Sequence, residues 1–429
     1  MVPHLKTALT GPINELEQRI LDAMPVIERW FRLEWMEHTP PLYAAVDIRN
    51  AGFKLAPVDT DLFPGGWHNL SDDVLPLAVQ AAQAAIEKIC PEARNLLIVP
   101  ENGTPSTLYL VSLARLEQIF RMAGLNVKFG SIDPALKRST TYALPDGEAL
   151  VFHPAQRTRY RLGLKQFDPC TILLNNDLAA GAPGILEDLH EQYLLPPLQA
   201  GWMVRRMSRH FRCYEEVSKR FGKLLGIDPW LIAPLFALCE QIDAPQGQEG
   251  LRDAVSAMLA RLRRKYKEYG IAEKPFVVLK PDNASRGAGF AVVREASELA
   301  AANAGKASAA LAALLAQGGD VIVQEGVLTQ ERLNEAVAEP VVNLIDRYVV
   351  GGYYRMRARA SETDNLSGPD ARYVPLAFDG HNRLPRAGAK PGASAPNRFY
   401  MYGVIARVAL VAASYELEAT DPQLLEIMA

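Results

Sequence analysis

The stretch VVLKPDNASRGAGFAVV, Val277 to Val293, decides how the second half of this chain is interpreted. Two apolar runs flank a polar loop, and one lysine, Lys280, ends the first run. The runs predict two strands, and the loop glycines Gly287 and Gly289 let backbone N–H groups approach a ligand. A strand-end lysine beside such a loop is typical of a phosphate site. A plain β-hairpin with a glycine turn is the structural alternative.

Several common phosphate-binding motifs are absent from this stretch. It lacks the GxxxxGK[ST] pattern of a P-loop, and it leads into a strand, whereas a dinucleotide-binding GxGxxG opens a helix. The HRD and DFG motifs of protein kinases are also missing from the chain. Ser285 and Arg286 add a hydrogen-bond donor and a positive charge to the loop.

Two later segments carry further residues that suit a phosphate-containing ligand. The run VIVQEGV predicts a strand that carries Gln324 and Glu325. The run YYRMRAR places Arg355, Arg357 and Arg359 on one face of a strand, because strand side chains alternate. Three arginines on one interior face need an anionic partner, and a phosphate cluster provides one. The alternative is an exposed edge strand that uses charge against aggregation.

Composition narrows the function classes. The chain has 429 residues, 49% of them hydrophobic and 22% charged, with a net charge of -3. This balance predicts a globular protein of more than one lobe and no nucleic-acid partner. Neither a secretory signal nor an apolar run long enough for a membrane helix is evident, so we expect a cytoplasmic protein with no membrane partner. Oligomeric state is left open, and a homo-oligomer is possible.

The first part of the chain alternates helices and strands. Roughly the first 40 residues have helical periodicity. NLLIVP (Asn95–Pro100), a helix from about Thr104 to Gly124, NVKFGSI and TILLNNDL then predict a parallel sheet with helices on its faces, a Rossmann-like lobe. The fold class is therefore α/β in the first part and α+β after residue 271. The predicted domains are 1–185 (substrate-binding α/β), 186–270 (helical connection) and 271–429 (nucleotide-binding lobe).

Five motifs in order resemble one known family. They are VDIRNAGFKLAPVDTDLFPGGWHNL (46–70), LLPPLQAGWMVRRMSRHF (194–211), KPDNASRGAGF (280–290), EPVVNLIDRYVVGGYYR (339–355) and DNLSGP (364–369). The lysine strand, glycine loop and later arginine are similar to the ATP-grasp fold. The motifs as a set resemble a bacterial glutamate–cysteine ligase family of ATP-grasp type, over nearly the whole chain. By this resemblance residues 271–429 are an ATP-grasp lobe and residues 1–185 resemble the domain that precedes it.

The resemblance implies a reaction and its reactants. ATP would phosphorylate the γ-carboxylate of L-glutamate, and the amine of L-cysteine would attack the acyl phosphate, giving γ-glutamylcysteine, the first intermediate of glutathione synthesis. The cofactors implied are ATP and Mg²⁺. Two alternatives stay open: another carboxylate–amine ligase, such as a glutathione synthetase-like enzyme, or a regulatory protein that binds nucleotide without turnover.

The resemblance also implies residue roles. The catalytic residues would be Lys280 and Arg355. The ATP site would comprise Lys280, Ser285, Arg286, Gly287, Gly289, Gln324, Glu325 and Lys223. The amino-acid site would comprise Asp47, Arg49, Asn50, Lys54, Asp59 and Asn69. An amino acid carries one ammonium and one carboxylate, so a site needs charges of both signs, which this segment supplies.

The metal site is the least defined part of the sequence. ATP-grasp enzymes usually carry Mg²⁺ ligands on an acidic strand with a Glu-x-Asn pattern, and the C-terminal stretch lacks that pattern. Asp364 and Asn365 offer oxygen ligands, which suit Mg²⁺. Glu339, at the start of a predicted strand, is an alternative.

Overall fold

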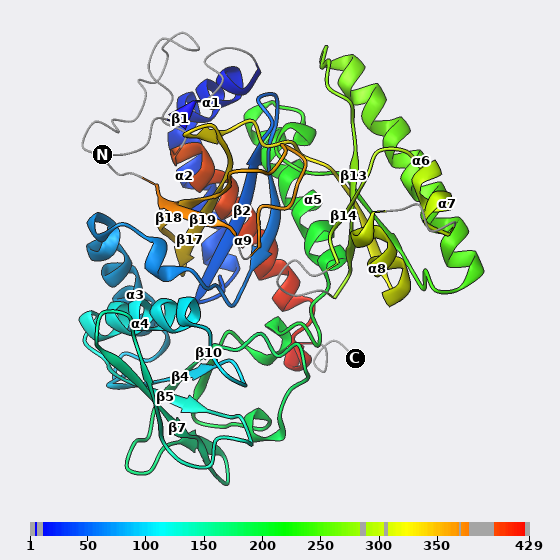
Figure 1. Ribbon diagram of the computed structural model, residues 1–429. Helices are drawn as coiled ribbons and strands as arrows, with labels where there is room; N and C mark the ends of the chain where they lie inside the picture. The colour runs from blue at the N-terminus through cyan, green and yellow to red at the C-terminus, as the bar shows by residue number, and fades with distance from the viewer. Residues whose placement is uncertain are drawn as a thin grey trace.

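The computed structural model of the protein describes residues 5–6, 12–283, 289–303, 308–368, 370–376 and 399–424. These residues form four β-sheets with helices packed against the three larger ones, a mixed α/β architecture (Figure 1). Within the described ranges, none of the helices combines the length and the hydropathy that crossing a membrane requires.

A seven-stranded sheet draws on both ends of the chain. Its strands are β1 (Leu5–Lys6), β16 (Arg332–Leu333), β17 (Ala336–Ile345), β18 (Tyr348–Arg357), β19 (Arg372–Pro375), β2 (Tyr43–Asn50) and β3 (Leu55–Asp61). Neighbouring strands are antiparallel, and β2 pairs with both β17 and β3. The predicted ranges 1–185 and 271–429 therefore share one sheet, and the division into three ranges remains a prediction about function.

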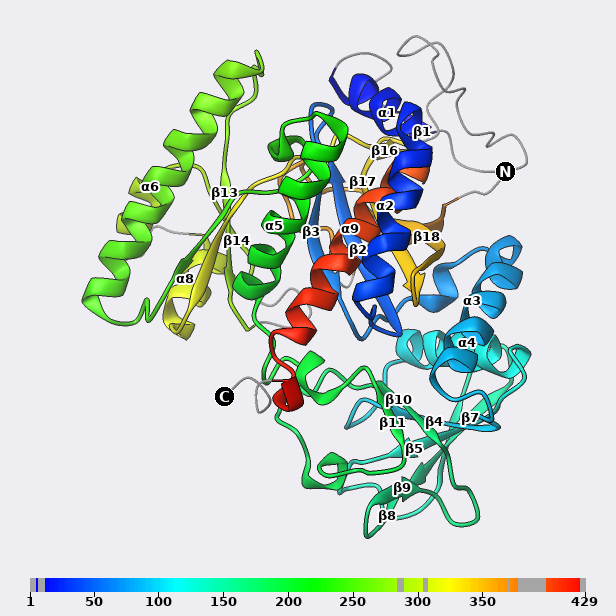
Figure 2. The same cartoon turned by 180° about the vertical axis from the view of Figure 1, so that it is seen from behind.

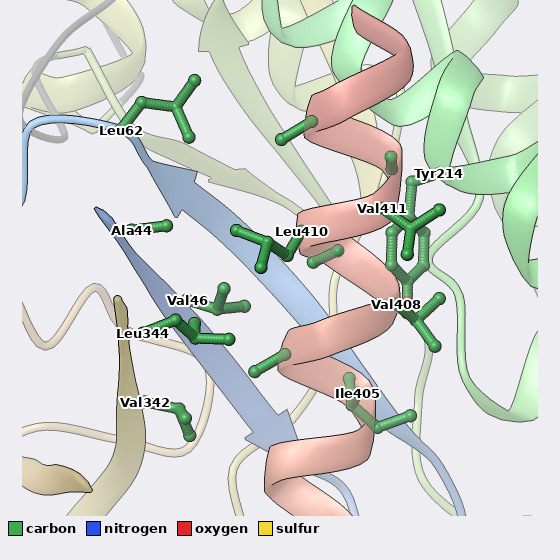
Figure 3. Close-up of a cluster of buried hydrophobic side chains, with 14 of the residues drawn as sticks. Ala44, Val46, Leu62, Tyr214, Val342, Leu344, Ile405, Val408, Leu410 and Val411 are labelled. Carbon is green, nitrogen blue, oxygen red and sulfur yellow. The ribbon is translucent and has the colours of Figure 1, made fainter. Parts of the chain in front are cut away.

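One face of this sheet packs against a buried helix, α9 (Phe399–Glu418). Figure 3 shows Leu410 of this helix extending toward the side of β2 and β17 that carries Val46 and Leu344. Successive side chains of a strand face opposite sides, so the residues between them point away from α9. Helix α9 is apolar on nearly all sides, as expected of a helix surrounded by core. The polar residues of β2 and β17 are left to the other face.

The helices near the N-terminus extend this layer. Helix α1 (Pro12–Asp22) and helix α2 (Met24–Glu37) confirm the helical periodicity of the first residues. Figure 2 shows α2, α9 and helix α5 (Met207–Leu225) covering the same side of β2 and β3. Glu28 of α2 pairs with Arg407 of α9 at 2.7 Å, which satisfies the one cation in the apolar helix.

A six-stranded sheet contains the strands predicted from the first part of the chain. In order its strands are β11 (Tyr193–Leu195), β10 (Thr171–Asn175), β4 (Asn95–Pro100), β5 (Asn126–Ser131), β7 (Ala149–Pro154) and β6 (Thr140–Ala143). All pairs except β6–β7 are parallel, which confirms the predicted parallel pairing of β4, β5 and β10. Helix α3 (Leu75–Ile89) and helix α4 (Thr107–Met122) share a core with this sheet and with β17 and β18.

The Lys280 stretch lies in a four-stranded antiparallel sheet. Its order is β12 (Phe236–Cys239), β15 (Val321–Glu325), β13 (Val277–Pro281) and β14 (Ala291–Val293). Helix α6 (Pro245–Glu268), helix α7 (Ser297–Asn303) and helix α8 (Ala309–Gln317) flank this sheet (Figure 1). The predicted strand–loop–strand is confirmed by the β13–β14 pairing. A short pair of strands, β8 (Gln156–Thr158) and β9 (Arg161–Gly163), forms the fourth sheet.

Candidate active site

A cavity of about 460 Å³ lies between the three larger sheets. Its floor is the face of the seven-stranded sheet that points away from α9. One wall comes from β13 and β15, and the opposite wall from the segments that follow β4 and β10. The lining residues that the sequence singled out are Asp47, Arg49, Asp59, Asn69, Lys280, Gln324, Glu325, Arg355 and Asn365.

Four charged side chains form a continuous network, here called the floor network: Asp47, Arg49, Glu339 and Arg355. Arg355 donates to both oxygens of the Asp47 carboxylate, at 2.5 and 3.3 Å, and to Glu339 Oε1 at 3.1 Å. Arg49 donates from Nε to the other Glu339 oxygen at 2.9 Å. With two cations and two anions, the network is electrically neutral as it stands.

Strand register brings the floor network together. Glu339 of β17 lies directly opposite Arg355 of β18, and Asp47 of β2 is paired with the next cavity-facing residue of β17, Val341. Burial alone would lower the pKa of Arg355, but the Asp47 and Glu339 carboxylates outweigh it and hold that pKa well above its usual value. Nε of Arg355 is buried and has no partner among the described residues, so the guanidinium keeps one donor to offer.

The expectation that three arginines converge on the cavity is wrong for two of them. Strand β18 ends at Arg357, whose side chain donates to the Asn365 carbonyl at 2.8 Å and pairs with Asp370 at 3.0 Å. Arg359 follows the strand and is exposed. Of the three, Arg355 alone lines the cavity. Strand β18 ends at Arg357, so the period of two does not extend to Arg359, and the Arg357 side chain is engaged by residues outside the cavity.

Lys280 ends β13 and reaches the cavity from the opposite sheet. Its Nζ donates to the carbonyl of Val58 at 2.8 Å, and no carboxylate within the described ranges forms an ion pair with it. Burial lowers the pKa of Lys280, and the Asp59 carboxylate opposes that change. Lys280 is half-buried, and its amine also lies 5.8 Å from the Phe290 ring centre. A partly desolvated amine whose neighbours are neutral is poorly compensated, which is typical of a site that awaits an anion.

The residues after Lys280 fix the end of the strand. Asp282 accepts hydrogen bonds from the backbone and the hydroxyl of Ser208 at 2.7 and 2.8 Å, which ties β13 to the first turn of α5. Gly289 has φ +76°, and an added Cβ would lie 2.8 Å from the Pro281 ring. The predicted loop residues Ser285, Arg286 and Gly287 lie outside the described residues.

Two of the predicted ligand residues, Lys54 and Glu325, form a closed polar group with Trp230, here called the hinge cluster, at the edge of the cavity that Glu325 lines. Lys54 donates to Glu325 Oε2 at 2.8 Å, and its amine lies 4.3 Å from the Trp230 ring centre. The same carboxylate accepts the Trp230 indole N–H at 3.1 Å and the backbone N–H of Leu235 at 2.9 Å. Lys54 is wholly buried and does not line the cavity. Burial lowers its pKa to about 8, against the pull of Glu325.

Gln324, one residue before the hinge cluster, has the opposite character. Its side chain is buried, lines the cavity, and leaves Nε2 with no partner among the described residues. An unsatisfied buried amide is costly, and a polar ligand in the cavity would satisfy it.

Of the remaining predicted residues, two lie away from the cavity and two line it. Asn50 donates to Glu331 at 2.9 Å and accepts from the backbone of Gly52, a turn-forming role away from the cavity. Lys223 is exposed on the last turn of α5 and does not line the cavity. Asp59 and Asn69 do line it.

The cavity is acidic where its floor meets the wall formed by the six-stranded sheet. Asp61 ends β3, Glu101 follows β4 and Asp177 follows β10, and all three line the cavity. No lysine or arginine of the six-stranded sheet or of α4 is among the lining residues. The cavity therefore has cations where the four- and seven-stranded sheets meet and an excess of carboxylates at the other end.

Sequence reasoning missed Asp61 as a cavity residue and named Glu339 only as an alternative metal ligand. It placed Glu101 and Asp177 after predicted strands, where parallel sheets bind ligands, but predicted no role for them. Asp61 follows Asp59 at the period of two that places both on one face of a strand, a signal present in the sequence. Glu101 and Asp177 follow neighbouring parallel strands, whose carboxyl ends share one edge of a sheet. That edge faces the floor only through tertiary packing, which no local pattern reveals.

The predicted metal ligands are already engaged. Asp364 accepts the backbone N–H of Ser361 at 2.8 Å and does not line the cavity; Asn365 lines it but accepts the N–H of Ser367 at 2.8 Å. Within the described ranges, no three His, Cys, Asp or Glu side chains are grouped closely enough to hold a metal by themselves. Asp47 and Glu339 offer two carboxylates that meet at the same Arg355 nitrogen.

Comparison with known proteins gives a family match. A family model named GshA, glutamate-cysteine ligase, matches residues 17–417. A crystal structure from Methylobacillus flagellatus KT, provisionally described as a gamma-glutamylcysteine synthetase, is 48% identical, covers 98% of this chain and 100% of its own, and superposes with a TM-score of 0.88. A search of curated protein sequences found no match.

Two more distant structures have low scores. D-alanyl-alanine synthetase A from Vibrio cholerae is 12% identical over 66% of this chain and 73% of its own, with a TM-score of 0.33. A glutathione synthetase-like effector from Globodera pallida is 9% identical over 84% of this chain and 83% of its own, with a TM-score of 0.38. At these scores neither carries weight for the fold.

Proposed function

Because the chain belongs to the glutamate–cysteine ligase family, and is thereby an ATP-dependent ligase, we propose that the cavity is where it joins L-glutamate to L-cysteine. We assign the four-stranded sheet and the floor to an ATP-grasp arrangement that holds the nucleotide between them. We regard the six-stranded sheet as a Rossmann-like unit that completes the amino-acid site.

One observation carries this proposal: Lys280 and Arg355, from two different sheets, face one cavity. A triphosphate held between two sheets needs cations from both, since its charge is spread over many oxygens. The unpaired amide of Gln324 lies on the same wall as Lys280 and suits a nucleotide acceptor atom. Gly289 and the sequence-predicted Ser285, Arg286 and Gly287 would cover the phosphates.

The first step is transfer of the γ-phosphoryl group. A γ-carboxylate oxygen of glutamate attacks the terminal phosphorus, the bond from that phosphorus to the bridging oxygen breaks, and ADP leaves with the electron pair. Lys280 and Arg355 stabilise the charge on the transferred group. Such positioned cations are worth about 10²- to 10³-fold in rate when one is removed.

The second step forms the peptide bond. The amine of cysteine attacks the carbonyl carbon of γ-glutamyl phosphate, and phosphate leaves. The acidic end of the cavity favours ammonium groups, and the cations of the floor favour carboxylates. We propose that Arg49, Asp59 and Asn69 bind the amino acids there and that Asp47 serves the metal instead, whereas Lys54 and Asn50 support the site from beneath.

Asp47 and Glu339 fit Mg²⁺ better than Asp364 and Asn365 do. Mg²⁺ typically takes one or two carboxylates and completes its shell with phosphate oxygens and water. The neutral floor network also leaves Lys280 to face the nucleotide charge, so a divalent cation is needed for balance. When bound, Mg²⁺ neutralises negative charge on the phosphates.

The proposal is tested by phosphate release from ATP and Mg²⁺ with the purified protein. We would compare glutamate alone, cysteine alone, both together, and γ-glutamylcysteine with glycine. The expected result is release that requires glutamate and cysteine together, with one γ-glutamylcysteine, identified by mass, for each phosphate.

Two other outcomes would assign the protein a different function. Release with γ-glutamylcysteine and glycine would instead make the protein a glutathione synthetase-like ligase. ATP binding without release in any mixture would contradict the catalytic assignment and support a regulatory role.

A further inference from the structure

Asp61 is the carboxylate at the junction between the floor and the acidic wall. It ends β3, two residues after Asp59, and lines the cavity. Its Oδ1 accepts the backbone N–H of Phe63 at 2.8 Å. No lysine or arginine in the described part of the chain forms an ion pair with it, in contrast to Asp47 and Glu339.

The charged groups around Asp61 come from every neighbouring element. Asp59 of β3 and Asp47 of β2 repel its negative charge, whereas Arg205 attracts it. Arg205 is held elsewhere, because it pairs with Glu416 at 3.0 Å and donates to the carbonyl of Thr60 at 2.6 Å. Tyr43 and Tyr353 also face this region, and burial raises the pKa of both hydroxyls, so they are neutral.

These surroundings make the Asp61 carboxylate more basic than that of an ordinary aspartate. Burial raises its pKa most, the Phe63 N–H lowers it, and the repulsion of Asp59 adds to the effect of burial, for a value of about 6. A proton acceptor works best when its pKa lies near the operating pH, while an ordinary aspartate lies near 4. Asp61 can thus accept a proton and release it again at neutral pH.

The proposed reaction needs such an acceptor. The α-amino group of a free amino acid has a pKa of about 8 or above, so cysteine arrives mostly as an ammonium ion without a lone pair. Lys280, Arg49 and Arg355 are cations and cannot take its proton. We propose that Asp61 is the general base that deprotonates the attacking amine, an inference that rests on the proposed function.

In the proposed step, every bond that forms is matched by a bond that breaks. An N–H bond of the ammonium breaks, its proton passes to the Asp61 carboxylate, and the electron pair stays on nitrogen. That pair forms the new bond to the γ-carbonyl carbon, and the carbon–oxygen bond to phosphate breaks with its pair on the leaving phosphate. The second amine proton leaves with phosphate, and Asp61 returns its proton to water.

The test compares two nucleophiles in wild type and Asp61→Asn. Hydroxylamine also traps acyl phosphates but is largely unprotonated at neutral pH, so it needs no base. We expect kcat with cysteine to fall about 10²- to 10⁴-fold in Asp61→Asn, with far less loss of hydroxamate formation from ATP and glutamate. The wild-type rate with cysteine should also decline as the pH falls through about 6, a limb that the variant should lack.

Asp146→Asn is the matched control. Asp146 accepts the backbone N–H of Glu148 at 3.0 Å, the same local turn that Asp61 makes with Phe63, but it is exposed and does not line the cavity. It should behave as wild type with both nucleophiles. The asparagine at position 61 can still accept the Phe63 N–H, so thermal unfolding should confirm that the variant is folded.

Three results would overturn the assignment. They are an equal loss with cysteine and hydroxylamine, a change in the KM for cysteine alone, and an acidic limb that persists in Asp61→Asn. Failure of the proposed function has a different signature, because wild type would then form neither dipeptide nor hydroxamate from glutamate.

Discussion

The hinge cluster and the cavity each contain a lysine, and the two lysines differ in how fully their charges are partnered. Lys54 of the hinge cluster is paired with a carboxylate that also binds an indole and a backbone N–H. Lys280 of the cavity donates to one carbonyl and faces open volume. Burial lowers the pKa of both, yet only Lys54 is fully partnered.

This difference distinguishes a lysine that supports the structure from one that can take part in the reaction. A closed group of partners fixes backbone position and leaves no donor for a ligand, so removing a member exposes an unpaired buried charge. A half-buried cation whose neighbours are neutral is held at a cost in stability and is available to an anion. Variants at the two lysines should therefore act on different quantities.

The largest effect is expected for Lys54→Met, which leaves the Glu325 carboxylate buried without its cation. We expect a loss of about 3–5 kcal/mol in the free energy of unfolding, measured by urea titration. The double variant Lys54→Met with Glu325→Gln should recover most of that loss, since it removes both charges. If Lys54→Met unfolds like wild type but loses turnover, Lys54 belongs to the chemistry instead.

Lys280→Met should show the reverse pattern. We expect turnover of ATP with glutamate and cysteine to fall about 10²- to 10³-fold, because a phosphate contact is lost. Stability should be unchanged or higher, since the hydrogen bond that is lost goes to a neutral carbonyl and not to a carboxylate. Steady-state phosphate release and thermal unfolding of the same sample measure both. Near-normal turnover would contradict the phosphate site.

In the absence of substrates, Asp61→Asn should increase the free energy of unfolding of the protein. The folded-state pKa of about 6 lies above the usual 3.8, so the folded protein binds the proton more tightly than the unfolded chain and loses stability as the pH rises between these values. The variant should gain about 1–2 kcal/mol near neutral pH, less than the full pKa difference implies, because cavity water screens the carboxylate. The gain should shrink on acidification toward pH 4. A loss of stability at neutral pH would mean that Asp61 is structural.

The smallest effect is expected for Lys223→Ala. Its side chain is exposed on α5 and does not line the cavity, so turnover should change by less than about twofold. The KM for ATP is the sensitive readout. A loss comparable to that of Lys280→Met would show that the nucleotide extends beyond the cavity described.

Local sequence patterns predicted much of the fold. The strands around Lys280, the strand of Gln324 and the β17–β18 hairpin follow from apolar runs and turn residues, and the structure confirms them. The pairing of β2 with β17 was not predictable, because it joins segments almost 300 residues apart without a local signal. The sequence predicts that α4 starts at about Thr104, whereas in the structure Ser106 caps a helix that begins at Thr107.

The candidate site, like the fold, could be predicted from the sequence only in part. Residue type and period identified Lys280 and Arg355 as cavity residues, but they could not separate Lys54 from Lys280. Both are lysines of a strand-like segment, and what distinguishes them is Glu325, which lies 271 residues from Lys54. Whether a lysine has all its hydrogen-bond and ion-pair partners depends on tertiary contacts, so only the structure could tell the two lysines apart.

The most direct test of the account follows oxygen-18 from the γ-carboxylate of labelled glutamate. If the cavity activates glutamate by phosphorylation, each phosphate released with γ-glutamylcysteine should carry one labelled oxygen, as measured by phosphorus NMR. Lys280→Met should slow labelled phosphate and dipeptide together. Dipeptide formed with unlabelled phosphate would contradict the acyl-phosphate route and the roles assigned to Lys280 and Arg355.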